Sequence, residues 1–155
     1  MISLFGVTKS EQLRALSEIC FNPAVEKISY KIVDEAIQTD SLSREQYRVL
    51  PLLYSKADLN QFSEFTATKI KSSHKHTLYR NHLLLHRAIK FKEALEEAGF
   101  AKSIFLKGVA HSLRASAGIG SRPMVDIDIL VKNLQKKPVE PMPLTFILFL
   151  LTRHC

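Results

Sequence analysis

The sequence is poor in cysteine and lacks a long apolar stretch. Its two cysteines, Cys20 and Cys155, lie at opposite ends of the 155 residues, with no Cys-x-x-Cys motif. This spacing favours neither a disulfide framework nor a zinc finger, so we expect a reducing, cytoplasmic setting. The first residues lack the basic start of a signal peptide. The apolar run 144–151 has eight residues, far below the roughly 20 of a membrane-spanning helix, and is expected to form a buried strand or a short helix.

Acidic residues are missing from the segment 65–92. In that segment there are seven lysines and arginines, with four histidines between them, in a chain whose formal net charge is +7. The seven are Lys69, Lys71, Lys75, Arg80, Arg87, Lys90 and Lys92. Such a helix face can attract a polyanion, and a solvated face with no partner is the alternative interpretation. No known nucleic-acid-binding motif accompanies these charges.

The first part of the chain is predicted to be helical. Thr8 with Glu11, and Ser43 with Gln46, have the spacing of a capping box at a helix start. Two prolines give further signals for helix ends and starts. Asn22-Pro23 is predicted to end one helix and to cap and begin the next. Pro51 is predicted to kink or end the segment that follows. A long helix is expected from 62 to 98, where Gly99 would terminate it.

Beyond the long helix the pattern changes to alternating strands and helices. We expect a strand at 103–106, a helix at 109–117 and a second strand at 124–131. In the second strand, Asp126 and Asp128 alternate with Val125, Ile127, Ile129 and Val131, so one face would be buried and the other would present both carboxylates. Their Cα atoms would lie about 6.6–7 Å apart, close enough for the side chains to share Mg²⁺. A solvated strand edge is the alternative.

A resemblance rests on Lys107-Gly108 and on residues 120–131, Gly-Ser-Arg-Pro-Met-Val-Asp-Ile-Asp-Ile-Leu-Val. This set resembles the uncharacterised nucleotidyltransferase family of the DNA polymerase beta-type superfamily. The resemblance implies an α+β fold with three parts. These are a helical region at 1–98, the start of a nucleotidyltransferase-type α/β core with a short mixed sheet at 99–133, and a divergent apolar tail at 134–155.

The resemblance also implies a reaction and a set of site residues. Asp126 and Asp128 would be catalytic and would hold Mg²⁺, or Mn²⁺ in its place, against an NTP. Lys107, Gly108 and Arg122 would bind the nucleotide. Lys107, at a strand end, would either pair with a phosphate or point to solvent, and Arg122 would either clamp a phosphate or brace the two aspartates. A nucleoside monophosphate would pass to the hydroxyl of an unknown acceptor: a small molecule, a protein or an RNA.

One element of the superfamily pattern is missing from the sequence. The superfamily carries a third carboxylate on a later strand, whereas only Glu140 is acidic after Asp128, and it lies between Pro138 and Pro141. Proline is disfavoured in a central strand. The sequence therefore predicts a truncated or divergent member with little or no turnover. The alternative from another class is a non-catalytic helical interaction module whose basic face binds an acidic partner.

Overall fold

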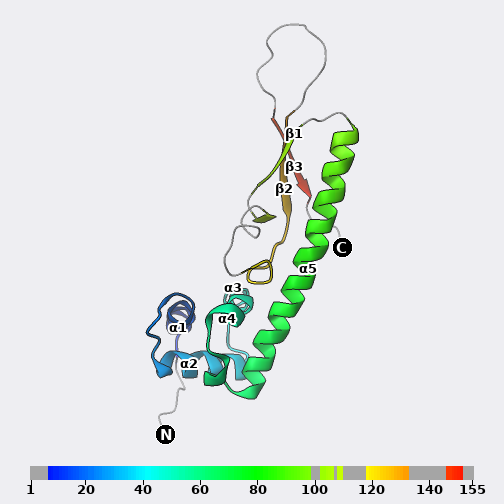
Figure 1. The fold of residues 1–155 in the computed structure, drawn as a ribbon. Coiled ribbons are helices and arrows are strands. Elements are labelled where there is room, and N and C mark those ends of the chain that lie inside the picture. The colour runs from blue at the N-terminus through cyan, green and yellow to red at the C-terminus, as the bar shows by residue number, and fades with distance from the viewer. Residues whose placement is uncertain (1–6, 99–101, 107, 110–117, 133–145, 152–155) are drawn as a thin grey trace. The chain divides into compact units, whose positions relative to one another are not determined.

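The computed structural model describes residues 7–98, 102–106, 108–109, 118–132 and 146–151 (Figure 1). The chain forms two compact units, one of residues 1–78 with 120–123 and the other of residues 79–119 with 124–155. Helices come first and strands follow, which confirms the predicted α+β class. Within the described ranges, no helix has both the length and the hydropathy needed to cross a membrane.

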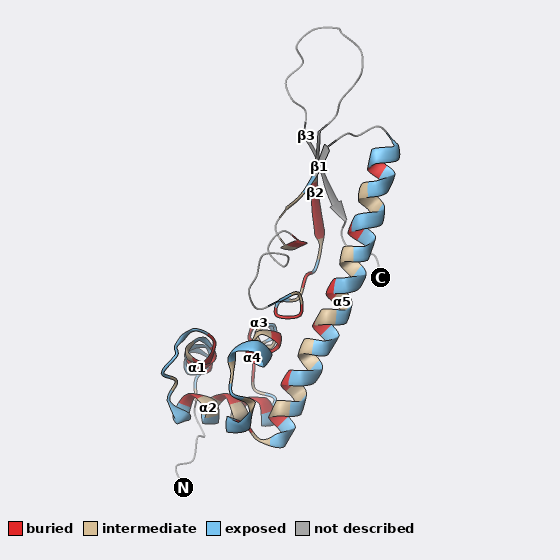
Figure 2. Cartoon of the chain, in the orientation of Figure 1, coloured by how far each residue is buried: buried red, intermediate tan, exposed pale blue. Residues whose placement is uncertain are grey.

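The first unit consists of short helices and the start of a long one. Its elements are α1 (Lys9–Phe21), α2 (Lys27–Gln38), α3 (Arg44–Tyr47), α4 (Leu50–Lys56), the 3₁₀ helix η1 (Leu59–Gln61) and the first turns of α5 (Glu64–Glu97). Their apolar sides form a core that includes Leu16, Ile37, Leu53 and Ile70, each no more than 1% exposed. Figure 2 shows these buried stripes along the helices. The long helix predicted at 62–98 is confirmed as α5.

Both predicted capping boxes are confirmed. At the start of α1, the Glu11 N–H donates to Thr8 Oγ1 at 3.2 Å, and the Thr8 N–H donates to Glu11 Oε2 at 2.7 Å. Ser43 and Gln46 make the same reciprocal pair at the start of α3. Each box satisfies backbone donors that a helix start would otherwise leave without a partner.

Of two proline-based predictions, the first was right only in that Asn22-Pro23 ends a helix, and the second was wrong. Asn22 does not begin α2; it ends α1, and its side-chain oxygen accepts the Ala24 N–H at 3.0 Å. The chain runs on to Glu26, which is the residue before α2. Pro51 neither kinks nor ends a helix, because it lies in the first turn of α4, where proline's missing N–H has no intrahelical acceptor to lose.

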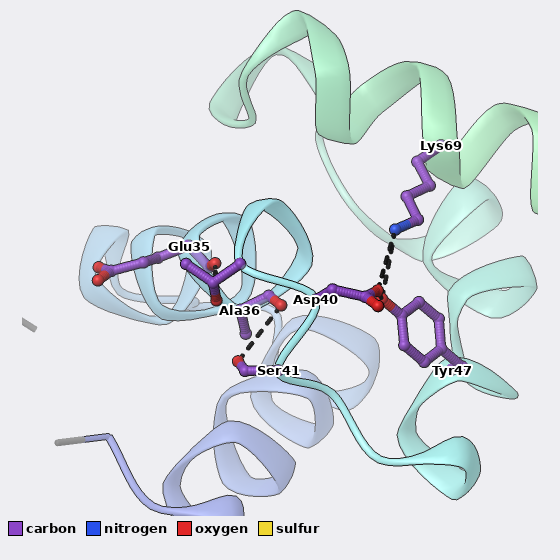
Figure 3. A network of polar contacts seen from close by, with 7 residues as sticks. Glu35, Ala36, Asp40, Ser41, Tyr47 and Lys69 are labelled. Atoms are coloured by element: carbon purple, nitrogen blue, oxygen red, sulfur yellow. Dashed lines mark hydrogen bonds and ion pairs between the residues drawn. The ribbon is translucent and has the colours of Figure 1, made fainter. Parts of the chain in front are cut away.

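A polar network links the end of α2 to α3 and α5 (Figure 3). Asp40 adopts a left-handed backbone conformation with φ of 53°, which aspartate tolerates better than most residues. The Tyr47 hydroxyl donates to the Asp40 carboxylate, and Lys69 Nζ lies 3.5 Å from the same oxygen. The hydrogen bond from Tyr47, together with the positive charge of Lys69, holds the pKa of Asp40 below its ordinary value.

The second unit contains a three-stranded sheet. Its strands are β1 (Lys102–Leu106), β2 (Ile127–Lys132) and β3 (Phe146–Leu151), in the order β1-β2-β3. Both pairings among these strands are antiparallel, so the described sheet is not the mixed one that the resemblance implied. Residue alternation indicates a strand but not the direction of its neighbours, which is why the sequence did not reveal this. The apolar run 144–151 supplies β3, as the strand alternative predicted.

One face of this unit buries an apolar cluster. It joins residues of α5 to residues around β2: Ala88, Leu95, Val109, Met124, Ile127 and Ile129. Ile127 and Ile129 are 2% and 0% exposed, which confirms the buried face predicted for this strand. The cluster anchors the chain on either side of Asp128.

Cys20 offers a direct test of the helical core. Its side chain is 5% exposed, and burial raises the pKa of its thiol to about 11. In a Cys155→Ser variant, which leaves one thiol, we expect no reaction with Ellman's reagent at pH 8 in the native protein and full reaction in urea, because only the exposed Cys20 thiolate can attack the disulfide of the reagent. Rapid labelling of the native variant would contradict the described packing of α1.

Candidate functional site

The two aspartates lie at the start of the central strand. Asp128 belongs to β2 and pairs in register with Leu106 of β1 and Leu150 of β3. It is 2% exposed, whereas Asp126 precedes the strand and is partly exposed. We expected both carboxylates on an open face, and for Asp128 this was wrong. The strand also begins at Ile127 and not at Met124, so the preceding residues are not held in the alternation of a strand.

The structure brings Gly108, two residues after β1, to Asp126. A Cβ atom added to Gly108 would lie 3.9 Å from the Asp126 carbonyl oxygen and 3.7 Å from Met124 Cγ. This follows from the antiparallel register, because Leu106 opposite Asp128 brings the residues just after β1 beside those just before β2. These are ordinary van der Waals distances. Gly108 therefore lies close to Asp126, but a larger residue at position 108 would also fit.

The remaining predicted site residues are Lys107 and Arg122. Arg122 is exposed and belongs to the segment 120–123 of the first unit. Lys107 and Glu140 lie outside the described residues, as does most of the predicted helix 109–117. The structure therefore joins Gly108 to the aspartate strand, and the nucleotide-binding roles of Lys107 and Arg122 stay predictions.

A residue that the sequence did not single out fixes the chain ahead of Asp126. Asn81 of α5 is fully buried; its side-chain amide donates to the Ile119 carbonyl, and its oxygen accepts the Met124 N–H at 3.0 Å. One side chain therefore holds both flanks of the turn before β2. The signal was available, because Asn81 extends the buried helical stripe of Leu84 and Ala88 by one turn, where a polar residue needs a partner.

Gly120 in the first unit is required by a close approach. A Cβ atom there would lie 2.5 Å from Cε1 and 2.8 Å from Nε2 of His74. The ring has little freedom to move, because it stacks on Tyr54 at a centroid distance of 4.3 Å and lies within 3.3 Å of the Pro51 carbonyl oxygen. The glycine of the Gly-Ser-Arg-Pro motif thus serves packing in this chain.

Gly120→Ala is expected to lower the free energy of unfolding by about 1–3 kcal/mol, the usual cost of forcing extra atoms into a packed site. Urea denaturation followed by circular dichroism measures it. Gly108→Ala is the matched control, since its added Cβ meets only ordinary contacts. A double-mutant cycle with His74→Ala should recover part of the loss. Equal stabilities for the two alanine variants would contradict this account of Gly120.

The donor chemistry of the site fits a hard divalent cation. Asp126 and Asp128 offer carboxylate oxygens, and Mg²⁺ is commonly held by one or two carboxylates with phosphates and water completing its shell. No cluster of three or more histidine, cysteine, aspartate or glutamate residues that could hold a metal occurs in the described parts of the chain. Two carboxylates would leave most of the coordination shell of Mg²⁺ to water and phosphates.

Comparison with known proteins identifies the family. A family model described as uncharacterised nucleotidyltransferase matches residues 42–141, which include the stretch from α3 to β2 with Gly108, Asp126 and Asp128. The match extends far upstream of the motif, over the whole of α5. No curated protein and no solved structure matches the chain significantly. The chain belongs to the uncharacterised nucleotidyltransferase family.

Proposed function

We propose that the chain binds an NTP with Mg²⁺, or Mn²⁺ in its place, for transfer of the nucleoside monophosphate to an acceptor hydroxyl. The observation that carries this proposal is the approach of Gly108 to Asp126, immediately ahead of the buried Asp128 in β2. Two carboxylates and the backbone of a glycine at one end of a sheet suit a site for a metal-bound triphosphate. Membership of a nucleotidyltransferase family supports the same kind of reaction.

Each residue has a distinct role in this proposal. Asp126 and Asp128 would hold the cation, which when bound would offset the negative charge of the triphosphate. The backbone of Asp128 is paired with β1 on one side and with β3 on the other, which fixes the position of this residue. Asp126 is partly exposed and therefore accessible to a ligand. Gly108 would let phosphate approach the backbone, and Lys107 and Arg122 would add positive charge.

Binding and turnover test different parts of the proposal. Mg²⁺-dependent NTP binding tests the site itself, and its absence for all four NTPs would contradict the proposal. Incubation with labelled NTPs, Mg²⁺ or Mn²⁺ and a cell extract as acceptor source tests transfer. Because the site offers two carboxylates where the superfamily carries three, we expect little label transfer by residues 1–155 alone. Robust transfer that disappears in Asp126→Asn would show that Glu140 or a partner chain completes the site.

A further inference from the structure

All the excess positive charge of the chain lies in one segment. The sequence has 22 lysines and arginines against 15 acidic residues, and the segment 65–92 holds seven of the former and none of the latter, which leaves equal numbers elsewhere. Among the residues that the structure describes, Lys69 pairs with Asp40 and Lys92 with Glu96. The other five cations form no ion pair within the described ranges. These five are Lys71, Lys75, Arg80, Arg87 and Lys90.

In the second unit, part of this charge forms a continuous exposed strip on α5, which we call the basic face. Its members follow the helical spacing i, i+3, i+4, i+7, i+8 and i+11. They are Tyr79, His82, Leu83, His86, Arg87 and Lys90, all exposed. Asn81, Ala88 and Leu95 lie on the opposite, buried side of the same helix. Figure 2 shows that exposed and buried residues alternate along α5.

The composition of the basic face indicates which kind of partner it binds. An ordinary solvated face carries charges of both signs and few large apolar groups. Here Tyr79 is 65% exposed and Leu83 is 43% exposed on the same face as Arg87 and Lys90. Cations that contact phosphates, interleaved with an aromatic ring on which a base can stack, are the features that bind single-stranded nucleic acid. The strip spans about 16 Å, or three helical turns, long enough for several phosphates.

We propose that the basic face of α5 binds single-stranded RNA. Arg87 and Lys90 would contact phosphates, and a base would stack on the Tyr79 ring.

Binding of a fluorescent 20-nucleotide single-stranded RNA, measured by anisotropy in EDTA without NTP, tests the basic face. Arg87→Gln with Lys90→Gln should weaken binding on the order of tenfold at 0.1 M salt and lower the salt slope by about 1.4, since each phosphate contact on a single strand contributes about 0.7. Lys27→Gln with Lys31→Gln removes the same charge from exposed positions of α2 and should have little effect. Tyr79→Ala should cost at least about fivefold, and Tyr79→Phe should not.

The outcomes separate this inference from the proposed function. RNA binding that depends on Arg87 and Lys90 while NTP binding is absent would retain the basic face and overturn the transferase proposal. Equal loss in the α2 control, or unchanged binding in the Arg87→Gln/Lys90→Gln variant, would overturn the basic face as an RNA site. Competition by polyglutamate as effective as that by unlabelled RNA of equal charge would also overturn it, in favour of an acidic protein partner.

Discussion

Asp126→Asn combined with Asp128→Asn is expected to abolish the Mg²⁺-dependent part of NTP affinity while the protein stays folded. Each substitution removes a negative oxygen donor and keeps nearly the same shape. Removing even an outer partner of a metal ligand costs about 10- to 100-fold in metal affinity, so loss of two direct ligands should cost at least that much. Titration calorimetry with ATP, GTP, CTP and UTP, each with and without Mg²⁺, measures the effect and identifies the preferred nucleotide.

The control for this variant matches its change in charge. Glu93→Gln with Glu97→Gln also removes two negative charges from the second unit, at exposed positions of α5 outside the motif. We expect this pair to leave the Mg²⁺-dependent affinity unchanged. If the aspartate variant retained the metal dependence, or if both variants lost it equally, Asp126 and Asp128 would not be the metal ligands.

Asn81→Ala is expected to lower the free energy of unfolding by about 2–4 kcal/mol. The substitution leaves the Ile119 carbonyl and the Met124 N–H without the side chain that they contact, and each unsatisfied buried group costs about 1–3 kcal/mol. Urea denaturation followed by circular dichroism reports the loss. Because the same contacts fix the chain just ahead of Asp126, NTP affinity should also fall at urea-free conditions where the variant is still folded.

Asn81→Asp separates the two contacts of this side chain. Aspartate keeps an acceptor for the Met124 N–H but loses the donor to the Ile119 carbonyl, and it adds a charge at a fully buried position. It should therefore be at least as damaging as alanine at neutral pH. A stability equal to that of the native protein in either variant would contradict the role given to Asn81.

The sequence predicted a helix start correctly where a local signal is compatible with only one structure. Thr8 with Glu11 forms its capping box from residues three apart, so no distant contact is needed to decide it. Asn22-Pro23 was ambiguous, because asparagine can end a helix as readily as it can begin one. In the structure, Asn22 ends α1 and the next helix begins only after Glu26. The two residues Asn22 and Pro23 alone do not indicate this later start.

The site was predictable in part. The spacing of Asp126 and Asp128 is local, and the family could be identified from the motif. The approach of Gly108 depends on the antiparallel register of β1 with β2, and the position of Asp128 inside the sheet depends on β3, which lies in the segment that the sequence suggested was a divergent tail. The contact of Asn81 with Ile119 joins residues 38 apart in sequence. The three-part division at 98 and 133 stays a prediction.

Paramagnetic broadening by Mn²⁺ locates the metal site. With Mn²⁺ and a non-hydrolysable NTP analogue, we expect the backbone amide NMR signals of Gly108 and Asp126 to broaden first, because Mn²⁺ would be held beside them. The cavity of about 260 Å³ lined by Glu11, Glu18 and Glu26 of the first unit is the acidic comparison site. Broadening centred on those glutamates, with sharp signals at Gly108 and Asp126, would show that Asp126 and Asp128 do not hold the metal.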